Sequence, residues 1–234
     1  MRLEIASYKA VKYACLNFHY AKSIPVNTFG YSVFNDKNEW CGVILYGLGA
    51  SPYVSQSLGM KQGQAAELVR VALNGKQNNV SKPLALSIRL FHKKNPLVKI
   101  LFSYSDLDQN HNGTIYQSAN WYYIGTVNKN MKSGYIVNGK KIHARVPNAK
   151  GIKNNITDVK KYLDPNATEF ITQGKHKYIY PLDKSVIAMC KELSKPYPKK
   201  LSGVVESNAN SQLDVKCVTT TLTPLVTDTN INKL

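Results

Sequence analysis

The chain has 234 residues, of which 43% are hydrophobic, and this suffices for one globular core or one core with an appended lobe. No segment approaches the roughly 20 uncharged apolar residues of a membrane span, and the charged N-terminal stretch lacks the apolar run of a secretory signal. The four cysteines lie far apart without a C-x-x-C pair, which argues against a disulfide framework and a zinc knuckle. We therefore expect a cytoplasmic protein without a membrane partner.

The charge is strongly positive, with 31 Lys and Arg against 14 Asp and Glu and a formal net charge of +17. Residues 1–125 carry a net charge of +7, residues 126–200 carry +11, and residues 201–234 carry −1. A concentrated cationic block is typical of polyanion binders, and lysines suit point contacts to phosphates better than bidentate reading of bases. A lysine-rich composition that only aids solubility is the alternative.

The first part of the chain predicts alternating strands and helices. We expect a strand at residues 2–6, a helix at 8–18, and a hairpin from two β-prone runs at 29–34 and 41–46. The Gly/Ser/Pro-rich loop at 47–59 is too long for a plain connection, and loops of that length are usually functional or disordered.

A buried-type strand at 66–73 carries one charge pair, Glu67 and Arg70. Charge in an apolar strand is costly unless it is paired or serves a ligand, so a structural salt bridge and a ligand site both remain open. Ser81 is the expected N-cap of the next helix. A helix N-terminus directly after a central strand favours binding of a phosphorylated cofactor.

The most distinctive segment is a strand, polar loop, helix and strand in the middle of the chain. A β-prone run at 100–104 leads into the loop 105–112 and a probable helix, and a second run at 121–124 closes the unit. Ligands of α/β sheets bind at the carboxyl ends of strands, where this loop is expected. Asp106 and His111 supply titratable groups for proton transfer, which favours a site over a solvated connection with Asx turns.

The second part of the chain is basic and β-rich. Runs at 135–137 and 142–146 bracket Asn138-Gly139, the strongest short hairpin signal in the sequence. The segment 174–184 interleaves basic and aromatic residues, as phosphate contact and base stacking require, although an edge strand guarded by lysines has the same pattern. The candidate DNA-binding residues are Lys140, Lys141, His143, Arg145, Lys175, His176, Lys177 and Tyr178.

These elements predict an α/β fold. Their order through residue 125 is that of the GNAT N-acyltransferase fold, a mixed central sheet flanked by helices, with the donor bound between a central strand and the following helix. We expect a catalytic core at 1–125, a basic extension packed on it at 126–200, and a Ser/Thr/Asn-rich tail at 201–234.

The amino-acid sequences of several motifs resemble those of the bacteriophage Mom family. The similar segments are FHYAKSIP (18–25), ELVRVAL (67–73), NVSKPLALSIRL (79–90), SYSDLDQNHNGTIYQSANWYYIG (103–125), IVNGKKIHAR (136–145) and DPNATEFITQGKHKYIYPLDK (164–184). The resemblance implies a GNAT-like enzyme that converts adenine in double-stranded DNA to N6-(carbamoylmethyl)adenine and so protects phage DNA from host restriction.

Site residues follow from the same resemblance. The catalytic positions fall on His19, Tyr20, Asp106 and Tyr116, and the donor-binding positions on Arg70 and Ser81. Iron is associated with the family, and His19, Asp106 and Tyr116 are the residues that would hold a metal. The Gly-rich donor loop of the wider superfamily is absent at 74–81, which leaves an acyl-CoA-like or another activated acyl or glycyl donor open.

The proposed chemistry needs specific groups, since the adenine N6 amine is a poor nucleophile that requires placement and a proton acceptor. Asp106 or His19 would take the proton, and Tyr116 would protonate the leaving group. The aromatics at 121–123 would stack on a flipped base. Two alternatives remain: a conventional N-acyltransferase acting on a protein or small amine, and a non-catalytic nucleic-acid-binding protein.

Overall fold

The structure is a computed structural model that describes residues 1–48 and 53–199. The expectations for residues 49–52 and for the tail at 201–234 lie outside the described residues. The helices and strands of the main body are β1 (Arg2–Ile5), α1 (Tyr8–Asn17), β2 (Thr28–Phe34), β3 (Trp40–Gly47), α2 (Tyr53–Gln56), β4 (Ala65–Leu73), α3 (Ser81–Lys94), β5 (Ile100–Asp106), η1 (Leu107–Gln109), α4 (Thr114–Gln117), β6 (Tyr122–Val127), β10 (Lys175–Pro181), η2 (Lys184–Val186) and α7 (Ile187–Leu193).

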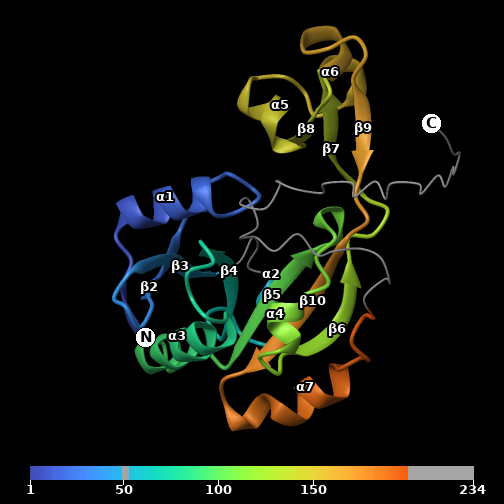
Figure 1. Cartoon of the computed structure of the whole chain (residues 1–234). Helices are drawn as coiled ribbons and strands as arrows, with labels where there is room; N and C mark the ends of the chain where they lie inside the picture. The colour runs from blue at the N-terminus through green and yellow to red at the C-terminus, as the bar shows by residue number, and fades with distance from the viewer. Residues whose placement is uncertain (49–52, 200–234) are drawn as a thin grey trace, which may run out of the picture.

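Seven strands form one mixed sheet in the order β1-β2-β3-β4-β5-β10-β6 (Figure 1). The pair β4 and β5 is parallel, and the other pairs of this sheet are antiparallel. The predicted α/β class is confirmed, and the elements through residue 125 occur in the predicted GNAT-like order. No helix among the described residues is long and apolar enough to cross a membrane.

Helices cover both faces of the sheet because alternate residues of each strand point to opposite sides. On one face, Leu84, Ile88 and Phe91 of α3 pack with Tyr46 and Leu68 of the sheet. The other face is covered by α1, through Ala14 and Cys15, by η2, through Val186, and by α7, through Cys190. Cys15, Cys41 and Cys190 are free and buried.

The parallel strands β4 and β5 part in the middle of the sheet. Their pairing begins with Ala65 opposite Ile100 and ends with Glu67 opposite Phe102, although both strands continue beyond this point. On its other side β4 pairs with β3, and the register of this pairing shifts between Leu45 and Tyr46, near the point where β4 separates from β5. The two strands therefore open a gap at their carboxyl ends.

A small lobe stands apart from the main body (Figure 1). Its elements are β7 (Lys132–Val137), β8 (Lys140–His143), α5 (Arg145–Ala149), α6 (Ile156–Tyr162) and β9 (Thr168–Ile171), with the strands ordered β8-β7-β9. Tyr135, Val159 and Ala167 form its core. The predicted Asn138-Gly139 turn is confirmed, with φ angles of 48° and 71° that suit a type I′ hairpin.

The predicted boundary of the basic extension does not match the sheets. Strand β10 lies inside the main sheet, paired with β5 on one side and β6 on the other, and α7 packs beside it. Buried Tyr178 and Ile179 explain why this segment joins the core in spite of its lysines. The lobe that the second sheet defines spans residues 132–171.

The start of α3 also differs from the prediction. The helix begins at Ser81 and its N-cap residue is Val80, whose side chain makes no capping bond. The Asn79 side chain instead accepts a hydrogen bond from the Lys82 N–H at 2.9 Å. Ser81 is therefore a first-turn residue, and its hydroxyl lies 3.2 Å from the Ser118 hydroxyl.

Candidate active site

A pocket of about 220 Å³ lies where β4 and β5 part. It is lined by His19 and Tyr20 after α1, by Glu67, Val69, Arg70 and Val71 of β4, by Tyr104, Ser105 and Asp106 of β5, by His111, Gly113, Thr114, Ile115 and Tyr116 around the start of α4, and by Lys175 of β10. The site is thus assembled from five separate segments around the gap in the sheet.

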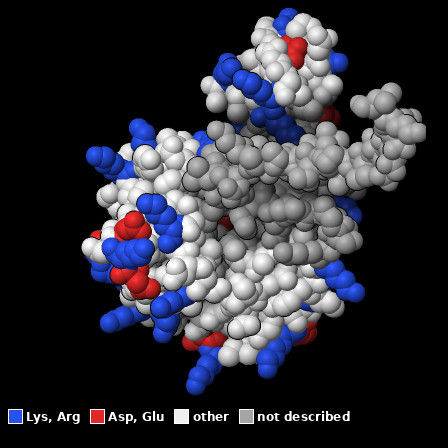
Figure 2. Space-filling model, in the orientation of Figure 1, with Lys and Arg blue, Asp and Glu red and all other residues white. Residues whose placement is uncertain are grey.

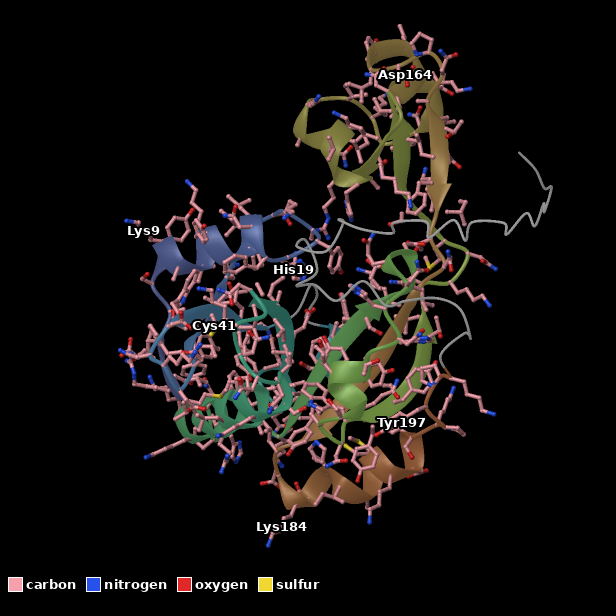
Figure 3. All side chains as sticks on the ribbon, in the orientation of Figure 1. Lys9, His19, Cys41, Asp164, Lys184 and Tyr197 are labelled. Carbon is pink, nitrogen blue, oxygen red and sulfur yellow. The ribbon has the colours of Figure 1, made fainter. Side chains whose placement is uncertain are left out.

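His19 follows the end of α1 and is 7% exposed (Figure 3). Its Nδ1 accepts a hydrogen bond from the Ala21 N–H at 3.1 Å. Burial, and then the positive charge of Arg70, lowers the pKa of His19 from 6.5 to about 3. The imidazole is therefore neutral at neutral pH, and because Nδ1 is the acceptor, the ring proton resides on Nε2.

Tyr20 lies between two imidazole rings. Its ring centroid is 4.3 Å from that of His19 and 5.1 Å from that of His111, against which it is edge-on. Burial, followed by the negative charge of Asp106, raises the pKa of the Tyr20 hydroxyl. Tyr20 therefore remains a neutral hydrogen-bonding group in the pocket.

Asp106 ends β5, and its carboxylate is held by its neighbours. It accepts a hydrogen bond from the Asp108 N–H at 3.0 Å, and the Lys175 Nζ lies 3.8 Å from the other oxygen. Lys175 stands directly opposite Asp106 in the sheet. These contacts orient the Asp106 carboxylate, and a ligand that binds to it would have to compete with them.

Tyr116 is buried and forms a hydrogen bond of 2.8 Å with the Ser103 hydroxyl. Burial raises the pKa of Tyr116 to about 12, and the nearby Ser103 opposes the shift. Tyr116 therefore carries its proton at neutral pH. Gly113 is the N-cap residue of α4 and has a φ of 75°, and a Cβ there would clash with the Tyr178 ring, so the turn needs glycine.

Glu67 and Arg70 both line the pocket, and no ion pair joins them among the described residues. The Arg70 Nε is buried without a hydrogen-bond partner in the described chain, and its Nη2 is 3.5 Å from the Ser23 hydroxyl. Burial raises the pKa of Glu67, while Lys175 and then Arg70 act in the opposite direction. The ligand-site interpretation of this pair therefore fits the structure better than the salt bridge.

Ser81 is not among the residues that line the pocket. A metal also fits poorly, because the described residues contain no group of three or more His, Cys, Asp or Glu side chains placed to hold one. The Nδ1 of His19 is already used by a backbone N–H, and the Asp106 carboxylate by another. The described residues therefore give no support to the expected iron site.

Apart from Lys175, which lines the pocket, the candidate DNA-binding residues separate into two groups. Lys140, Lys141, His143 and Arg145 are exposed on the small lobe, over which Figure 2 shows Lys and Arg side chains. His176, Lys177 and Tyr178 are instead buried within the main sheet, at 8%, 8% and 0% exposure. The prediction that these three contact DNA is corrected, because β10 has a neighbouring strand on each side.

Sequence reasoning missed two members of the pocket. The sequence identifies Glu67 as a charge in an apolar strand. Whether its side chain lines a pocket depends on where β4 and β5 part, which the sequence does not show. The sequence predicts Lys175 at a DNA-binding surface, whereas the structure places it opposite Asp106 in the lining of the pocket. The one local indication for Lys175 is that it follows Gly174 and begins a β-prone run, so it is expected at the end of a strand, where ligands of such sheets bind.

The fold and this pocket define an α/β protein with a polar site between its parting central strands. A comparison with family models then shows a match to the Mom protein family over residues 1–199, and the chain belongs to that family. The resemblance found in the motifs is thereby confirmed.

Solved structures with a similar arrangement have little sequence in common with the chain. An acetyltransferase of Bacillus subtilis in complex with CoA is 11% identical, with a TM-score of 0.44, and the match covers 78% of this chain and 99% of that one. For a dodecameric spermidine N-acetyltransferase of Vibrio cholerae the identity is 6%, the TM-score 0.45, and the coverage 80% and 96%. No match was found among curated proteins.

Proposed function

We propose that this protein transfers a carbamoylmethyl group to N6 of adenine in double-stranded DNA, using an activated acyl or glycyl donor of the acyl-CoA type. In a phage this modification protects DNA from host restriction. One observation carries the proposal: five residues implied by the Mom resemblance, from four separate segments, line a single pocket. They are His19, Tyr20, Arg70, Asp106 and Tyr116.

The protonation states of these groups suit a transfer reaction. Tyr116, with a pKa of about 12, holds a proton that it can give to the leaving group of the donor. Neutral His19 offers its Nε2–H as a hydrogen-bond donor inside the pocket. The Arg70 Nε–H has no hydrogen-bond partner within the part of the chain that the structure describes, which supports binding of an anionic donor group there.

The small lobe supports a duplex DNA substrate. Its exposed cations are Lys140, Lys141, Arg145, Lys150, Lys153, Lys160 and Lys161. Its three acids are engaged within the lobe: Asp158 with Asn155, Asp164 with two backbone N–H groups, and Glu169 with Lys132. The positive charge is therefore available to phosphates.

The lobe also emerges beside the pocket. Its two connections leave the main sheet after β6 and before β10, at the end of the sheet where Lys175 is opposite both Asp106 and Val127. The positive charges of Arg145 and Lys175, after burial, lower the pKa of His143, so the lobe and the pocket are within electrostatic reach. A duplex bound to the lobe would present its bases near the pocket.

Mass spectrometry of nucleosides from the DNA of cells that express the protein tests this function. We expect a new adenosine derivative whose added mass is that of a carbamoylmethyl group, with fragments that place it on the base. An Asp106→Ala, Tyr116→Phe double variant is expected to yield none. Unmodified adenine in the presence of well-folded parent protein would contradict the proposal and favour a non-catalytic nucleic-acid-binding protein.

A further inference from the structure

Two carboxylic acids line the pocket, and their surroundings differ. Asp106 is occupied by the Asp108 N–H and by Lys175. The Glu67 carboxylate makes no hydrogen bond and no ion pair with any residue in the described ranges 1–48 and 53–199. A half-buried carboxylate that faces a cavity without a partner is available to a ligand.

The backbone fixes Glu67 at the floor of the gap. It is the last residue of β4 that pairs with β5, immediately before the strands part. On its other side it pairs with Gly47 of β3. A side chain on a strand that is hydrogen-bonded on both edges is held in position, as a reacting group requires.

The charge of Glu67 interacts with several other groups of the pocket. Lys175 and Arg70 stabilise its negative charge, whereas burial opposes it more strongly. The charge of Glu67 in turn contributes to raising the pKa of Tyr104 and Tyr116. The carboxylate is therefore within Coulombic reach of groups on three different strands and one helix.

The two residues first considered as proton acceptors are less suitable. His19 already accepts a backbone hydrogen bond at Nδ1 and carries its proton on Nε2, so it donates rather than accepts in the pocket. Asp106 accepts a hydrogen bond from the Asp108 N–H at one oxygen, and the Lys175 ammonium group lies 3.8 Å from the other, so both oxygens already have a neighbour.

We propose that Glu67 is the catalytic base that takes the proton of the attacking amine. This role rests on the proposed transfer to adenine. As the bond from N6 to the methylene carbon of the carbamoylmethyl group forms, the bond from that methylene carbon to the leaving group of the donor breaks. The N6 proton passes to Glu67, and the leaving group receives the proton of Tyr116.

The assignment makes the rate depend on the ionisation of one acid. Protonated Glu67 cannot accept, so the rate of the parent protein rises with pH through the pKa of Glu67, which burial places above its ordinary value. The titratable and charged groups that share the pocket with Glu67 are Arg70 on β4, Tyr104 and Asp106 on β5, Lys175 on β10, His111 and Tyr116 around α4, and His19 and Tyr20 after α1. Neutral His19 and protonated Tyr116 keep their states near neutral pH, so they add no step there.

The test compares the full-length parent with Glu67→Gln, Glu67→Asp and Glu192→Gln. Glu192 is exposed on α7, so its variant controls for the loss of one carboxylate. Each protein is incubated with duplex DNA and the protein-free small-molecule extract of expressing cells as donor source. The initial rate of adenine modification is measured by mass spectrometry from about pH 5.5 to 9. Fluorescence anisotropy gives the affinity for the duplex, and circular dichroism gives the melting temperature.

We expect Glu67→Gln to lose about 100-fold or more in rate at neutral pH. Its affinity for the duplex is expected to stay within about twofold, because the side chain lies below the surface that would bind phosphates. Glu67→Asp is expected to recover part of the rate together with the rise with pH, which a purely structural role would not produce. It also covers the case in which the amide variant fails to fold.

Three outcomes are distinguishable. A Glu67→Gln protein with the rate and pH profile of the parent overturns the role of Glu67 and leaves the proposed function intact. A parent protein that modifies no adenine overturns the proposed function, and the role of Glu67 with it. A pH-independent parent rate, with Glu67→Asp no faster than Glu67→Gln, also contradicts proton transfer to Glu67.

Discussion

The carboxylate of Asp108 accepts a hydrogen bond from the Thr172 hydroxyl at 2.5 Å, which fastens the loop after β5 to the segment that returns from the small lobe. The same carboxylate accepts the Gln173 N–H at 3.0 Å, and the Leu107 N–H donates to the Gly174 carbonyl at 3.2 Å. Because Asp106 precedes this loop and lines the pocket, these contacts join the lobe to the site.

Asp108→Asn tests the strength of this connection. The amide has a single acceptor oxygen, so the Thr172 hydroxyl and the Gln173 N–H can no longer both donate to residue 108, and the negative charge that strengthens these bonds is lost. We expect the free energy of unfolding to fall by about 1–3 kcal/mol, the usual range for a part-buried bond to a charged acceptor. Urea unfolding at neutral pH measures it, with Glu192→Gln as the control. An unchanged midpoint would show that the connection contributes nothing net.

The order of elements was predictable because it follows from local patterns. Period-2 and period-3.6 hydrophobicity identified β4 and α3, and Asn138-Gly139 identified its hairpin. The position of β10 was not predictable, since it depends on pairing between Lys175 and Asp106, which are distant in sequence. Basic and aromatic alternation looks the same on a surface ribbon as in a central strand that buries its lysines.

The site was predictable in part for the same reason. The polar loop after β5 and the helix after it were located by composition, and the Mom motifs added His19, Tyr20 and Arg70. For Glu67, the sequence shows only a charged residue in an apolar strand and not which face of the sheet it occupies. Which face of β4 it points to, and that the gap opens just beyond it, are properties of the sheet register.

Gly113→Ala is expected to damage the site through the Tyr178 ring. The new methyl group would meet the Tyr178 Cζ at 2.6 Å, and the residue would keep a φ of 75°. Overpacking of this kind costs about 1–3 kcal/mol, and the backbone strain adds to it. Thermal unfolding of Gly113→Ala beside Gly139→Ala separates the two effects.

Gly139 is the matched control because its φ is 71° and nothing lies within 4 Å of an added Cβ. Gly139→Ala therefore reports strain without the clash. If both variants melted at the same temperature, the contact with Tyr178 would not restrict residue 113.

His19→Asn is expected to flatten the dependence of stability on pH. The unfolded chain binds a proton at His19 below its ordinary pKa of about 6.5, whereas the folded protein does so only near pH 3. The stability from neutral His19 is thus complete above about pH 6.5 and declines as the pH falls, by up to about 1.4 kcal/mol per pH unit. Asparagine can still accept the Ala21 N–H but does not titrate. Urea midpoints of parent and variant at several acidic pH values measure the difference; parallel curves would contradict a neutral His19.

The charge of the small lobe predicts salt-dependent binding of DNA. Lys140→Glu combined with Lys141→Glu is expected to weaken duplex binding and to lower the slope of log affinity against log salt by about 0.9 for each phosphate that the lobe no longer neutralises. Lys93→Glu combined with Lys94→Glu makes the same change of net charge at the far end of α3 and is the control. Equal slopes for the two double variants would assign the binding to net charge alone rather than to the lobe.

Lys177→Met separates the buried lysine of β10 from the exposed ones. The residue is 8% exposed, and its ammonium group has only the Ser57 hydroxyl, 3.5 Å away, as a hydrogen-bond partner among the described residues. Burial lowers its pKa, so the charged form is less favourable in the folded than in the unfolded state at neutral pH. This cost disappears as the pH rises above the ordinary lysine pKa of about 10.4, where both states are neutral.

An apolar side chain of similar length removes the cost and fills the same space over Phe102, where the Lys177 Nζ lies 5.9 Å from the ring centroid. We therefore expect Lys177→Met to melt at a higher temperature than the parent at neutral pH, with a gap that narrows toward pH 10. Its affinity for a DNA duplex is expected to match that of the parent, in contrast to the lobe variants. A lower melting temperature together with weaker DNA binding would contradict this expectation and would show that Lys177 contacts DNA, as the sequence predicts. Replacing a buried lysine that does not contact phosphate is expected to cause neither of these losses.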